Sequence, residues 1–482
     1  MNSASESSAD LRPLFVKLDG VVVRTNVFVE SVFALLKKQI SAIGWMLRWS
    51  LKGQANLKAQ IAERTEIDVQ TLPFNRPFLE FLKGEAAAGR ELILVTSSNV
   101  ALAKSIVDHL GIFKDILASD AESNLVGRHL VDRIQASAGA SEFVYAGNGQ
   151  DDQEIWKHAA GAILVDPRSD VERTLGGRVP VVRRFEDPQF DSLTNYLRAV
   201  RLHQWLKNLL VFVPITLAHH LNDFSAILQA TLAFLSFCLC ASSVYLLNDL
   251  LDLQDDRHHS TKCQRPFAAG SIRLLHGVFA VPILLAASIV LALFLPLKFA
   301  GILGLYYVST LAYSFFLKRA APIDVLLLAG LFTLRILAGA AAISVFPSFW
   351  LLAFSMFLFL SLALVKRCSE ISSRTNSTDV KIAGRGYRTS DLETLSQLGG
   401  ASGYMAVMVL ALYINSEEVK LLYNNPEYIW LICPILLYMM TRIWLLTRRN
   451  EMKEDPVVFF IKDKRSLALT LISVFLLFLA TQ

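Results

Sequence analysis

The sequence predicts a chain of two parts, an N-terminal α/β domain followed by an all-α bundle of about nine membrane-spanning helices. Apolar strand-like runs alternate with helix-like stretches up to about residue 190, and long apolar runs repeat from about residue 200 to the end. Of the 482 residues, 53% are hydrophobic and 18% are charged, whereas soluble proteins carry about a quarter charged residues. The net charge of +5 is too small to indicate a nucleic acid as partner.

The first domain is expected over residues 1–190. Its strand-like runs lie at 14–23, 91–98, 142–149 and 162–167. Buried strands that alternate with helices are typical of a parallel sheet covered on both faces, with a site at the carboxyl ends of the strands. The N-terminus is polar, unlike a secretory signal. The five cysteines form no CxxC pair, so we expect neither a disulfide framework nor structural zinc.

Residues 27–64 have helical periodicity, with Trp45 and Trp49 on the apolar side and several lysines and arginines opposite. Two interpretations stay open. A basic amphipathic helix can lie on a membrane surface, or the segment forms a helical cap packed on the α/β domain.

The second domain is expected over residues 195–482. An apolar helix of about 20 residues crosses the roughly 30 Å of a bilayer's hydrocarbon, and we expect spans near 206–218, 225–247, 275–295, 300–317, 323–346, 349–365, 400–414, 427–446 and 467–481. Basic residues gather in alternate loops, whereas the loops between them hold only Lys298 and Lys420. The positive-inside rule therefore places the basic loops and the first domain in the cytoplasm.

An acidic run, Asn-Asp-Leu-Leu-Asp-Leu-Gln-Asp-Asp-Arg over residues 248–257, follows the second expected span. The spacing places Asn248, Asp252 and Asp256 on one face of a helix. Carboxylates beside a bilayer are costly unless a cation neutralises them, and Mg²⁺ prefers such oxygen ligands and often also binds substrate phosphates. The alternative is a solvated acidic loop. We predict Mg²⁺ ligands at Asn248, Asp249, Asp252 and Asp256, and phosphate contacts from Arg257, Lys262 and Arg265.

This run resembles the first aspartate-rich motif of the UbiA-type intramembrane prenyltransferases, and the resemblance covers about residues 195–482. It implies a helical bundle around a cavity, Mg²⁺ that bridges the aspartates and a diphosphate, and a polyprenyl substrate that enters from the bilayer. The chain departs from the family in the loop after the sixth span. That loop has no DxxxD motif; it is basic, and its acids are Glu370, Asp379 and Asp391.

The basic loop, the Leu-His-Gln-Trp-Leu-Lys-Asn run at 202–208 and Asp455-Pro456 together resemble one branch, the polyprenyl-phosphate phosphoribosyltransferases (decaprenylphosphoryl-5-phosphoribose synthase type). The resemblance implies phosphoribosyl pyrophosphate as donor, a polyprenyl phosphate as acceptor, and a multi-pass protein of the bacterial inner membrane that serves cell-envelope glycan synthesis. Two alternatives stay open: a conventional prenyltransferase that moves a polyprenyl group from its diphosphate to an aromatic or other small acceptor, and a transporter or scaffold whose acids bind ions. The sequence leaves open whether the protein is a homo-oligomer.

The reaction assigns roles to the polar residues. A leaving diphosphate needs cations, and a lipid phosphate needs placement rather than a strong base. We expect catalytic roles for Asp249, Asp252, Asp256, Lys366, Arg385 and Tyr387, and substrate binding by Lys207, Asn248, Arg257, Lys262, Arg265, Lys318, Arg335, Glu370 and Asp391. Each of these charges also has an alternative explanation without a functional role. The basic loop can reflect only the positive-inside rule, Arg335 can form a structural pair with a carboxylate, and Lys318 can extend its side chain to the membrane surface.

In the first domain, Asp19-Gly20, Thr96 and the pair Asn148 and Asp152 resemble motifs of the haloacid dehalogenase-like phosphatases. The departures are large: Lys17 stands where that family has its nucleophilic aspartate, Asn148 replaces an acidic metal ligand, and the motif lysine is missing unless Arg128 substitutes for it. Lysine cannot form an aspartyl-phosphate. We therefore expect a phosphatase-like fold whose degenerate site comprises Lys17, Asp19, Thr96, Asn148 and Asp152. The alternative is an active phosphatase for the 5-phosphate of the product.

Overall fold

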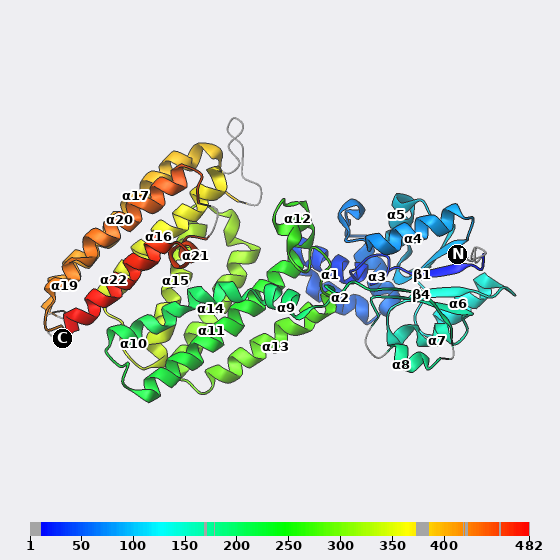
Figure 1. The fold of residues 1–482 in the computed structure, drawn as a ribbon, viewed down its shortest axis with the longest axis horizontal. Coiled ribbons are helices and arrows are strands. Elements are labelled where there is room, and N and C mark those ends of the chain that lie inside the picture. The colour runs from blue at the N-terminus through cyan, green and yellow to red at the C-terminus, as the bar shows by residue number, and fades with distance from the viewer. Residues whose placement is uncertain are drawn as a thin grey trace, which may run out of the picture. The chain divides into compact units, whose positions relative to one another are not determined.

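The computed structural model describes residues 11–167, 171–177, 179–372, 385–417, 419, 423–452 and 455–481 (Figure 1). The chain forms two compact units. The first comprises Met1–Val200 and Tyr245–Val281, and the second comprises Arg201–Val244 and Pro282–Gln482. The acidic run predicted to bind metal therefore folds with the N-terminal part of the chain.

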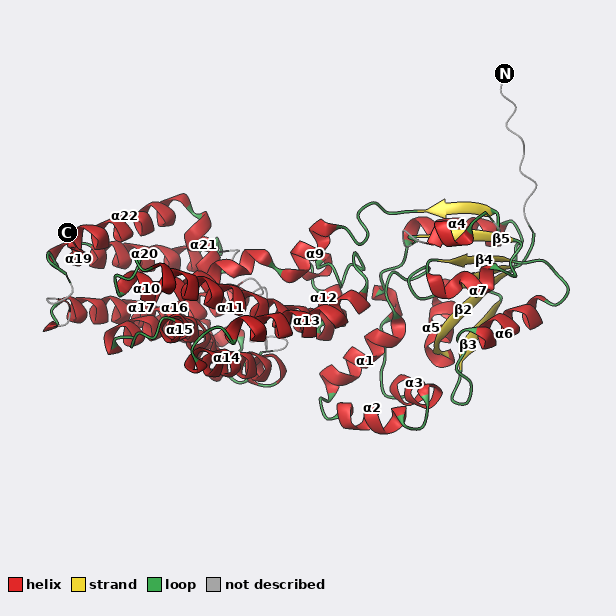
Figure 2. Ribbon diagram, turned by 90° about the horizontal axis from the view of Figure 1, so that it is seen from below, coloured by secondary structure: helices red, strands yellow, loops and turns green. Residues whose placement is uncertain are grey.

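The first unit is built on a six-stranded sheet in the order β3-β2-β1-β4-β5-β6 (Figure 2). Every pair is parallel. The strands are β1 Leu14–Lys17, β2 Leu92–Asn99, β3 Asp115–Ser119, β4 Val144–Gly147, β5 Gly161–Val165 and β6 Val181–Phe185. The predicted parallel sheet is confirmed, and β1 lies at its centre, so that its carboxyl end meets those of β2 and β4.

Helices cover both faces of this sheet. Side chains of β1 alternate between two cores, because successive residues of a strand point to opposite faces: Leu14 and Val16 belong to one core and Phe15 to the other. The helices that lie wholly within the first unit, 3₁₀ helices included, are α1 Val27–Lys38, α2 Ala42–Ser50, α3 Gln54–Ala62, η1 Val69–Thr71, α4 Arg76–Ala87, α5 Val100–Leu110, α6 Arg128–Ala138, η2 Gln150–Asp152, α7 Gln153–Trp156, α8 Val171–Leu175, α9 Leu193–Val200, α12 Leu253–His258 and η4 Lys262–Gln264.

The amphipathic segment 27–64 forms α1, α2 and α3 rather than one helix. Helices α1 and α3 pack against β2, which supports the interpretation of a helical cap. Helix α2 keeps large apolar side chains in solvent, with Trp45 41% and Leu47 65% exposed. An interfacial role for α2 stays a prediction.

The second unit is helical. Two helices belong to both units, α11 Phe224–Leu251 and α13 Leu274–Ala292. The others are η3 Leu202–Phe212, α10 Val213–Leu217, α14 Leu297–Phe315, η5 Leu317–Arg319, α15 Ile323–Ala342, α16 Phe349–Ser372, η6 Thr389–Asp391, α17 Leu392–Ile414, α19 Glu427–Trp430, α20 Ile432–Arg448, α21 Pro456–Lys462 and α22 Lys464–Thr481.

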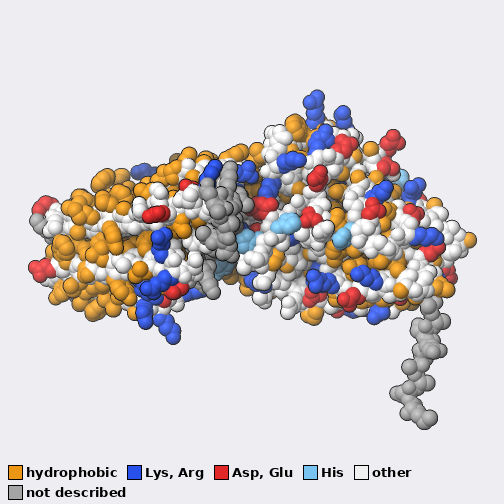
Figure 3. Space-filling model, turned by 90° about the horizontal axis from the view of Figure 1, so that it is seen from above, with side chains coloured by type: hydrophobic (Ala, Val, Ile, Leu, Met, Phe, Trp, Pro, Cys, Tyr) orange, Lys and Arg blue, Asp and Glu red, His pale blue; other side chains and the backbone are white. Residues whose placement is uncertain are grey.

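Seven helices in the described part of the chain are long and apolar enough to cross a membrane, so the expected count of nine is not confirmed. The first expected span, 206–218, is divided between the 3₁₀ helix η3 and the five-residue α10. The fourth forms α14 but is not one of the seven. Figure 3 shows apolar side chains gathered over the helical part and charged ones spread over the rest of the face in view.

Candidate functional site

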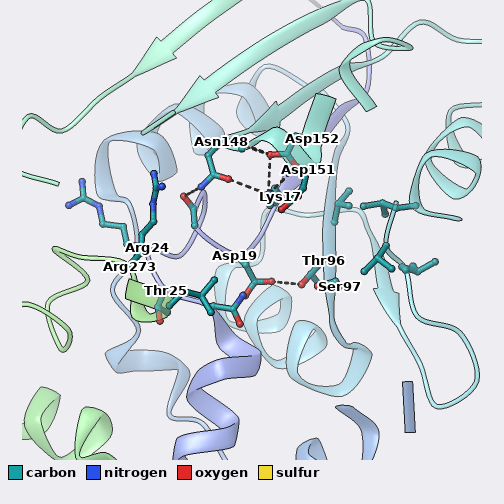
Figure 4. Close-up of a pocket in the computed structure, with 18 of the residues that line it drawn as sticks. Lys17, Asp19, Arg24, Thr25, Thr96, Ser97, Asn148, Asp151, Asp152 and Arg273 are labelled. Carbon is teal, nitrogen blue, oxygen red and sulfur yellow. Dashed lines mark hydrogen bonds and ion pairs between the residues drawn. The ribbon is translucent and has the colours of Figure 1, made fainter. Parts of the chain in front are cut away.

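A cavity of about 440 Å³ lies in the first unit where β1, β2 and β4 end (Figure 4). Its lining includes all five residues of the predicted degenerate phosphatase site: Lys17, Asp19, Thr96, Asn148 and Asp152. The carboxyl ends of adjacent parallel strands meet at one edge of a sheet, which is why residues up to 135 positions apart in the chain share this cavity.

The positive charge of Lys17 is paired with a carboxylate inside the cavity. Its Nζ lies 3.0 Å from both carboxylate oxygens of Asp152 and 3.2 Å from Oδ1 of Asn148. Asp152 is 2% exposed, and it also accepts hydrogen bonds from the backbone N–H groups of Asn148 and Gly149, each at 2.9 Å. The ammonium group thus occupies the position between the β1 and β4 loops, beside the acid that would otherwise attract a cation.

Asp19 makes structural contacts. Its Oδ2 accepts a hydrogen bond from Thr96 Oγ1 at 2.7 Å and one from Ser98 Oγ at 3.3 Å. Its Oδ1 accepts one from the backbone N–H of Val27 at 2.7 Å, at the first residue of α1. Asp19 therefore connects the floor of the cavity to the start of α1.

Lys58 is a residue that sequence reasoning missed. It projects from α3, is 8% exposed, and donates to the carbonyl oxygen of Ser97 at 2.6 Å and to Oδ1 of Asn124 at 2.8 Å. Burial lowers the pKa of Lys58, although the charge of Asp19 opposes that shift. Arg128, the suggested substitute for a motif lysine, is exposed on the first turn of α6. In the sequence Lys58 is one of several lysines of the amphipathic segment, and nothing distinguishes it from the others.

The acidic segment, defined as residues 248–258, bends at Asp252. Helix α11 ends at Leu251 and α12 begins at Leu253, with Asp252 between them. Backbone hydrogen bonds continue across the bend, from Asp252 N to Asn248 O at 2.9 Å and from Asp256 N to Asp252 O at 2.8 Å. The spacing of the acids is therefore close to that of the expected helix.

Four aspartates of this segment form ion pairs with two cations, two aspartates with each cation. Nη1 of Arg265 lies 3.1 Å from Asp249 Oδ1 and 2.6 Å from Asp256 Oδ2, and both aspartates are 2% exposed. Lys37 of α1 contacts Asp252 and Asp255, at 2.8 and 2.7 Å. Burial raises the pKa of Asp256, while the charge of Arg265 opposes the shift.

The donor chemistry suits Mg²⁺. Two buried carboxylates already converge on one cationic nitrogen, and hard oxygen donors are the ligands that Mg²⁺ prefers. Within the described ranges, however, no three His, Cys, Asp or Glu side chains are close enough to hold a metal ion. Asn248 is half-buried on the last turn of α11, and Lys262 is exposed at the start of η4. Arg257 pairs with Glu30 of α1, so its guanidinium is already engaged.

In the second unit, Lys207 and Lys366 share one carboxylate. Asp455, which accepts a hydrogen bond from Val457 N at the start of α21, lies 2.6 Å from Lys207 Nζ and 3.4 Å from Lys366 Nζ. Lys207 is 6% exposed. Burial by itself would raise the pKa of Asp455, but the charges of Lys207 and Lys366 hold this pKa at about 2.

Arg335 lies in the middle of α15 and is 5% exposed. Its Nε donates to Oδ1 of Asn208 at 2.8 Å and its Nη2 to the hydroxyl of Tyr306 at 3.1 Å. Its guanidinium also lies 5.0 Å from the ring centroid of Tyr306 and 5.2 Å from that of Phe332. Among the described residues no carboxylate pairs with Arg335, so these neutral contacts take the place of the structural ion pair considered above.

Arg367 is the centre of a second network, on α16. It is 1% exposed; its Nε lies 2.7 Å from Asp324 Oδ2, its Nη2 donates to the Tyr313 hydroxyl at 3.1 Å, and its Nη1 pairs with Glu370. Arg385 donates to the same Tyr313 hydroxyl at 3.0 Å and lies 3.7 Å from Glu370. The predicted residues Arg385 and Glu370 therefore lie together.

Tyr387 joins this network by donating a hydrogen bond to Asp324. Burial raises the pKa of the Tyr387 hydroxyl, and the contact with Asp324 adds to the shift. A Cβ at Gly386 would lie 2.5 Å from the carbonyl oxygen of Arg319. Close approach of two backbones thus explains the glycine of this loop, and ion pairing explains its arginine.

Two predicted residues lie elsewhere, and a third acid of the loop is not described. Asp391 accepts a hydrogen bond from Arg388 N at 2.8 Å, a local cap of η6. Lys318 is partly exposed in η5. Asp379 lies outside the described residues.

Gly339 of α15 holds η3 in place. A Cβ at this position would lie 2.0 Å from the carbonyl oxygen of Val211, so the two backbones touch. Because η3 carries both Lys207 and Asn208, this contact fixes how the two side chains reach Asp455 and Arg335.

The apolar helices with buried charges between them define a multi-pass membrane protein. Residues 209–469 match the model of the UbiA prenyltransferase family. The chain belongs to this family, and its class is that of the transferases.

Three relatives show how far the similarity extends. The uncharacterized protein y4nM of Sinorhizobium fredii is 36% identical over 456 residues, which cover 94% of this chain and 88% of that protein. The nodulation protein NoeC of Azorhizobium caulinodans is 33% identical over 296 residues, 60% of this chain and 94% of that one. The decaprenyl-phosphate phosphoribosyltransferase of Mycolicibacterium smegmatis is 35% identical over 190 residues, 38% of this chain and 59% of that enzyme.

Among solved structures, a UbiA homolog from Archaeoglobus fulgidus bound to GPP and Mg²⁺ aligns with 60% of this chain and 99% of that chain, at 16% identity and a TM-score of 0.45. A likeness at this level carries no conclusion about ligands.

Proposed function

We propose that the protein is an Mg²⁺-dependent transferase that moves a 5-phosphoribosyl group from phosphoribosyl pyrophosphate to a polyprenyl phosphate, with its polar loops facing the cytoplasm of a bacterial inner membrane. In this reaction a phosphate oxygen of the lipid forms a bond to C1 of the ribose. The bond from C1 to the diphosphate breaks, and the diphosphate leaves with the electron pair. The product would serve the synthesis of cell-envelope glycans.

The observation that carries this proposal is the excess of positive charge among the described residues of one part of the second unit, where Lys207, Arg335 and Arg367 are buried and Lys366 and Arg385 are partly exposed. Five cations form ion pairs or contacts there: Lys207, Arg335, Lys366, Arg367 and Arg385. Within the described ranges, three carboxylates pair with them, Asp324, Glu370 and Asp455. Charge that is removed from water without a counter-charge is costly, and an anionic substrate such as a lipid phosphate would balance this excess. A neutral aromatic acceptor would not.

The acidic segment would hold Mg²⁺ through Asn248, Asp249, Asp252 and Asp256. Bound there, the metal would supply positive charge to the leaving diphosphate. Arg265 already contacts Asp249 and Asp256, so it is placed to exchange an aspartate for a phosphate oxygen as the metal enters. Lys262 is a second candidate for the diphosphate, and Lys366, Arg385 and Tyr387 are candidates for the lipid phosphate.

The first unit is proposed to be a phosphatase-like domain, over about residues 1–190, without phosphatase activity. Its would-be nucleophile is a lysine paired with Asp152, and an ammonium group cannot accept a phosphoryl group to give an aspartyl-phosphate.

The test is transfer of label by the purified full-length protein in lipid nanodiscs. We expect label from ribose-labelled phosphoribosyl pyrophosphate to enter the lipid fraction when polyprenyl phosphate and Mg²⁺ are present, and not in EDTA. Asp256→Asn should abolish the transfer, and Glu393→Gln, which removes an exposed carboxylate of α17, should not. Label that moves only from a prenyl diphosphate to a small acceptor would replace this proposal with the conventional prenyltransferase.

A further inference from the structure

Helix α1 of the first unit contacts the acidic segment through a buried ion pair. Glu30 is 2% exposed, and its Oε2 accepts a hydrogen bond from Arg257 Nη1 at 2.9 Å, while its Oε1 pairs with Nη2. The Nε of Arg257 donates to the carbonyl oxygen of Ala268 at 3.0 Å. All three nitrogens of this guanidinium are therefore engaged, and the fork of two parallel contacts fixes its orientation.

A second cation on α1 contacts the acids themselves. Lys37 lies in the last turn of α1, and its Nζ is 2.8 Å from Asp252 Oδ1 and 2.7 Å from Asp255 Oδ2. A divalent cation bound to Asp252 would have to share this carboxylate with an ammonium group, and like charges at such distances repel.

Side-chain hydrogen bonds also fix the N-terminus of α1. Asp19 accepts a hydrogen bond from Val27 N at 2.7 Å, and Asn26 accepts one from Val29 N at 2.9 Å as the N-cap. Two further contacts join the segment to the residues after α3: Gln254 Nε2 donates to the carbonyl oxygen of Glu66 at 3.2 Å, and His258 lies 3.1 Å from Asp68. The acidic segment is thus held by the first unit at several points along its length.

We propose that α1 controls metal binding by the acidic segment: Glu30 is a positioning residue that acts through Arg257, and Lys37 is a built-in counter-ion that competes with the divalent cation for Asp252. This inference rests on the proposed function of the acidic segment as a metal site. It gives the first unit a task that needs no phosphatase chemistry, and it makes Asp19 the anchor of the helix that performs this task.

The two residues have opposite expected effects. Lys37→Gln removes a competing positive charge, so we expect the affinity for a divalent cation to rise about tenfold or more. Glu30→Gln leaves the charge of Arg257 without its partner beside the acids, so we expect the affinity to fall about tenfold or more. The double variant Glu30→Gln/Arg257→Gln removes both charges of the pair, and replacing both members of a buried pair is often tolerated. It should recover most of the lost affinity.

The measurement is Mn²⁺ binding to the full-length protein in detergent, followed by the electron paramagnetic resonance signal of free Mn²⁺ without substrates. Lys38→Gln, at the neighbouring exposed position of α1, and Glu80→Gln, at an exposed position of α4, are matched controls expected to bind like the wild type. Size-exclusion profiles show which variants remain folded, and the double variant tests the pair if Glu30→Gln alone does not fold.

The outcomes separate the two proposals. Wild-type Mn²⁺ binding that Asp256→Asn abolishes, with Lys37→Gln unchanged or weaker than the wild type, would overturn the inference and leave the metal site standing. Equal losses in Lys37→Gln and Glu30→Gln would also overturn it, because a merely structural role predicts the same sign for both. A wild type that binds no Mn²⁺ at the acidic segment would remove both the inference and the proposed function.

Discussion

Replacing Asp455 by asparagine would test the charge balance of the second unit. Asparagine is as good an N-cap as aspartate, so the hydrogen bond to Val457 N at the start of α21 can be kept. What the change removes is the negative charge that Lys207 and Lys366 share, at 2.6 and 3.4 Å. The variant therefore isolates the ion pairs from the cap.

The pKa of Asp455 gives the size of the effect. A pKa of about 2 in place of 3.8 corresponds to about 2 kcal/mol in favour of the folded state, at 1.36 kcal/mol for each pKa unit. Because the folded-state pKa lies below the unfolded one, this stabilisation is complete above about pH 4 and is lost as the pH falls towards 2. At pH 7 the variant should thus show the full loss.

The assay is thermal unfolding of the full-length protein in detergent at pH 7. A loss of about 2 kcal/mol should lower Tm by several degrees, at roughly 2–4 °C for each kcal/mol in a unit of this size. Added inorganic phosphate should raise Tm more in Asp455→Asn than in the wild type, since the remaining cations then lack their carboxylate. Equal Tm values without phosphate, or a weaker response of the variant to phosphate, would refute the reasoning.

Three further predictions concern activity. Asp256→Asn should lower lipid labelling at least about 100-fold, the loss typical of a group that stabilises charge in the transition state; activity within threefold of wild type would exclude Asp256 as a metal ligand. Arg385→Ala should raise KM for the lipid phosphate about tenfold or more, whereas Arg449→Ala, at an exposed position after α20, should not; equal effects of the two would leave only general surface charge. Lys17→Asp should give the full-length protein Mg²⁺-dependent hydrolysis of p-nitrophenyl phosphate, which the wild type should lack; hydrolysis by the wild type would contradict the assignment of a degenerate site.

The sequence predicted the parallel sheet because its central strands are buried and apolar. It did not predict the two edge strands: β3 Asp115–Ser119, which is only partly buried, and β6 Val181–Phe185, which includes two arginines and is mostly exposed. Apolar run length also failed at 206–218, where the chain forms a 3₁₀ helix and a short α-helix. Apolar patterns thus identify buried elements and miss exposed edge strands, and the length of an apolar run does not by itself determine which kind of helix it forms.

The members of the charged clusters were largely predictable, but their pairings were not. Lys207, Arg335 and Lys366 stand out as charges within or beside apolar runs, and Arg385 stands out in the Gly-Arg-Gly-Tyr cluster of the basic loop. The partner of Lys207, however, lies 248 positions away, and no local pattern joins the two. Lys58 and Tyr313 were missed for the same reason, since each acquires its role only through packing against another element.

The backbone contact between Gly339 and Val211 limits which residues this chain tolerates at a position without charge or polarity. Even a methyl group at residue 339 would push η3 away from α15, and with it the lysine and asparagine that reach the buried charges. A change to alanine in an apolar helix would pass as harmless in a hydropathy profile. Here it is expected to weaken the contacts of Lys207 and Asn208 with Asp455 and Arg335, because only glycine lets the two backbones approach this closely.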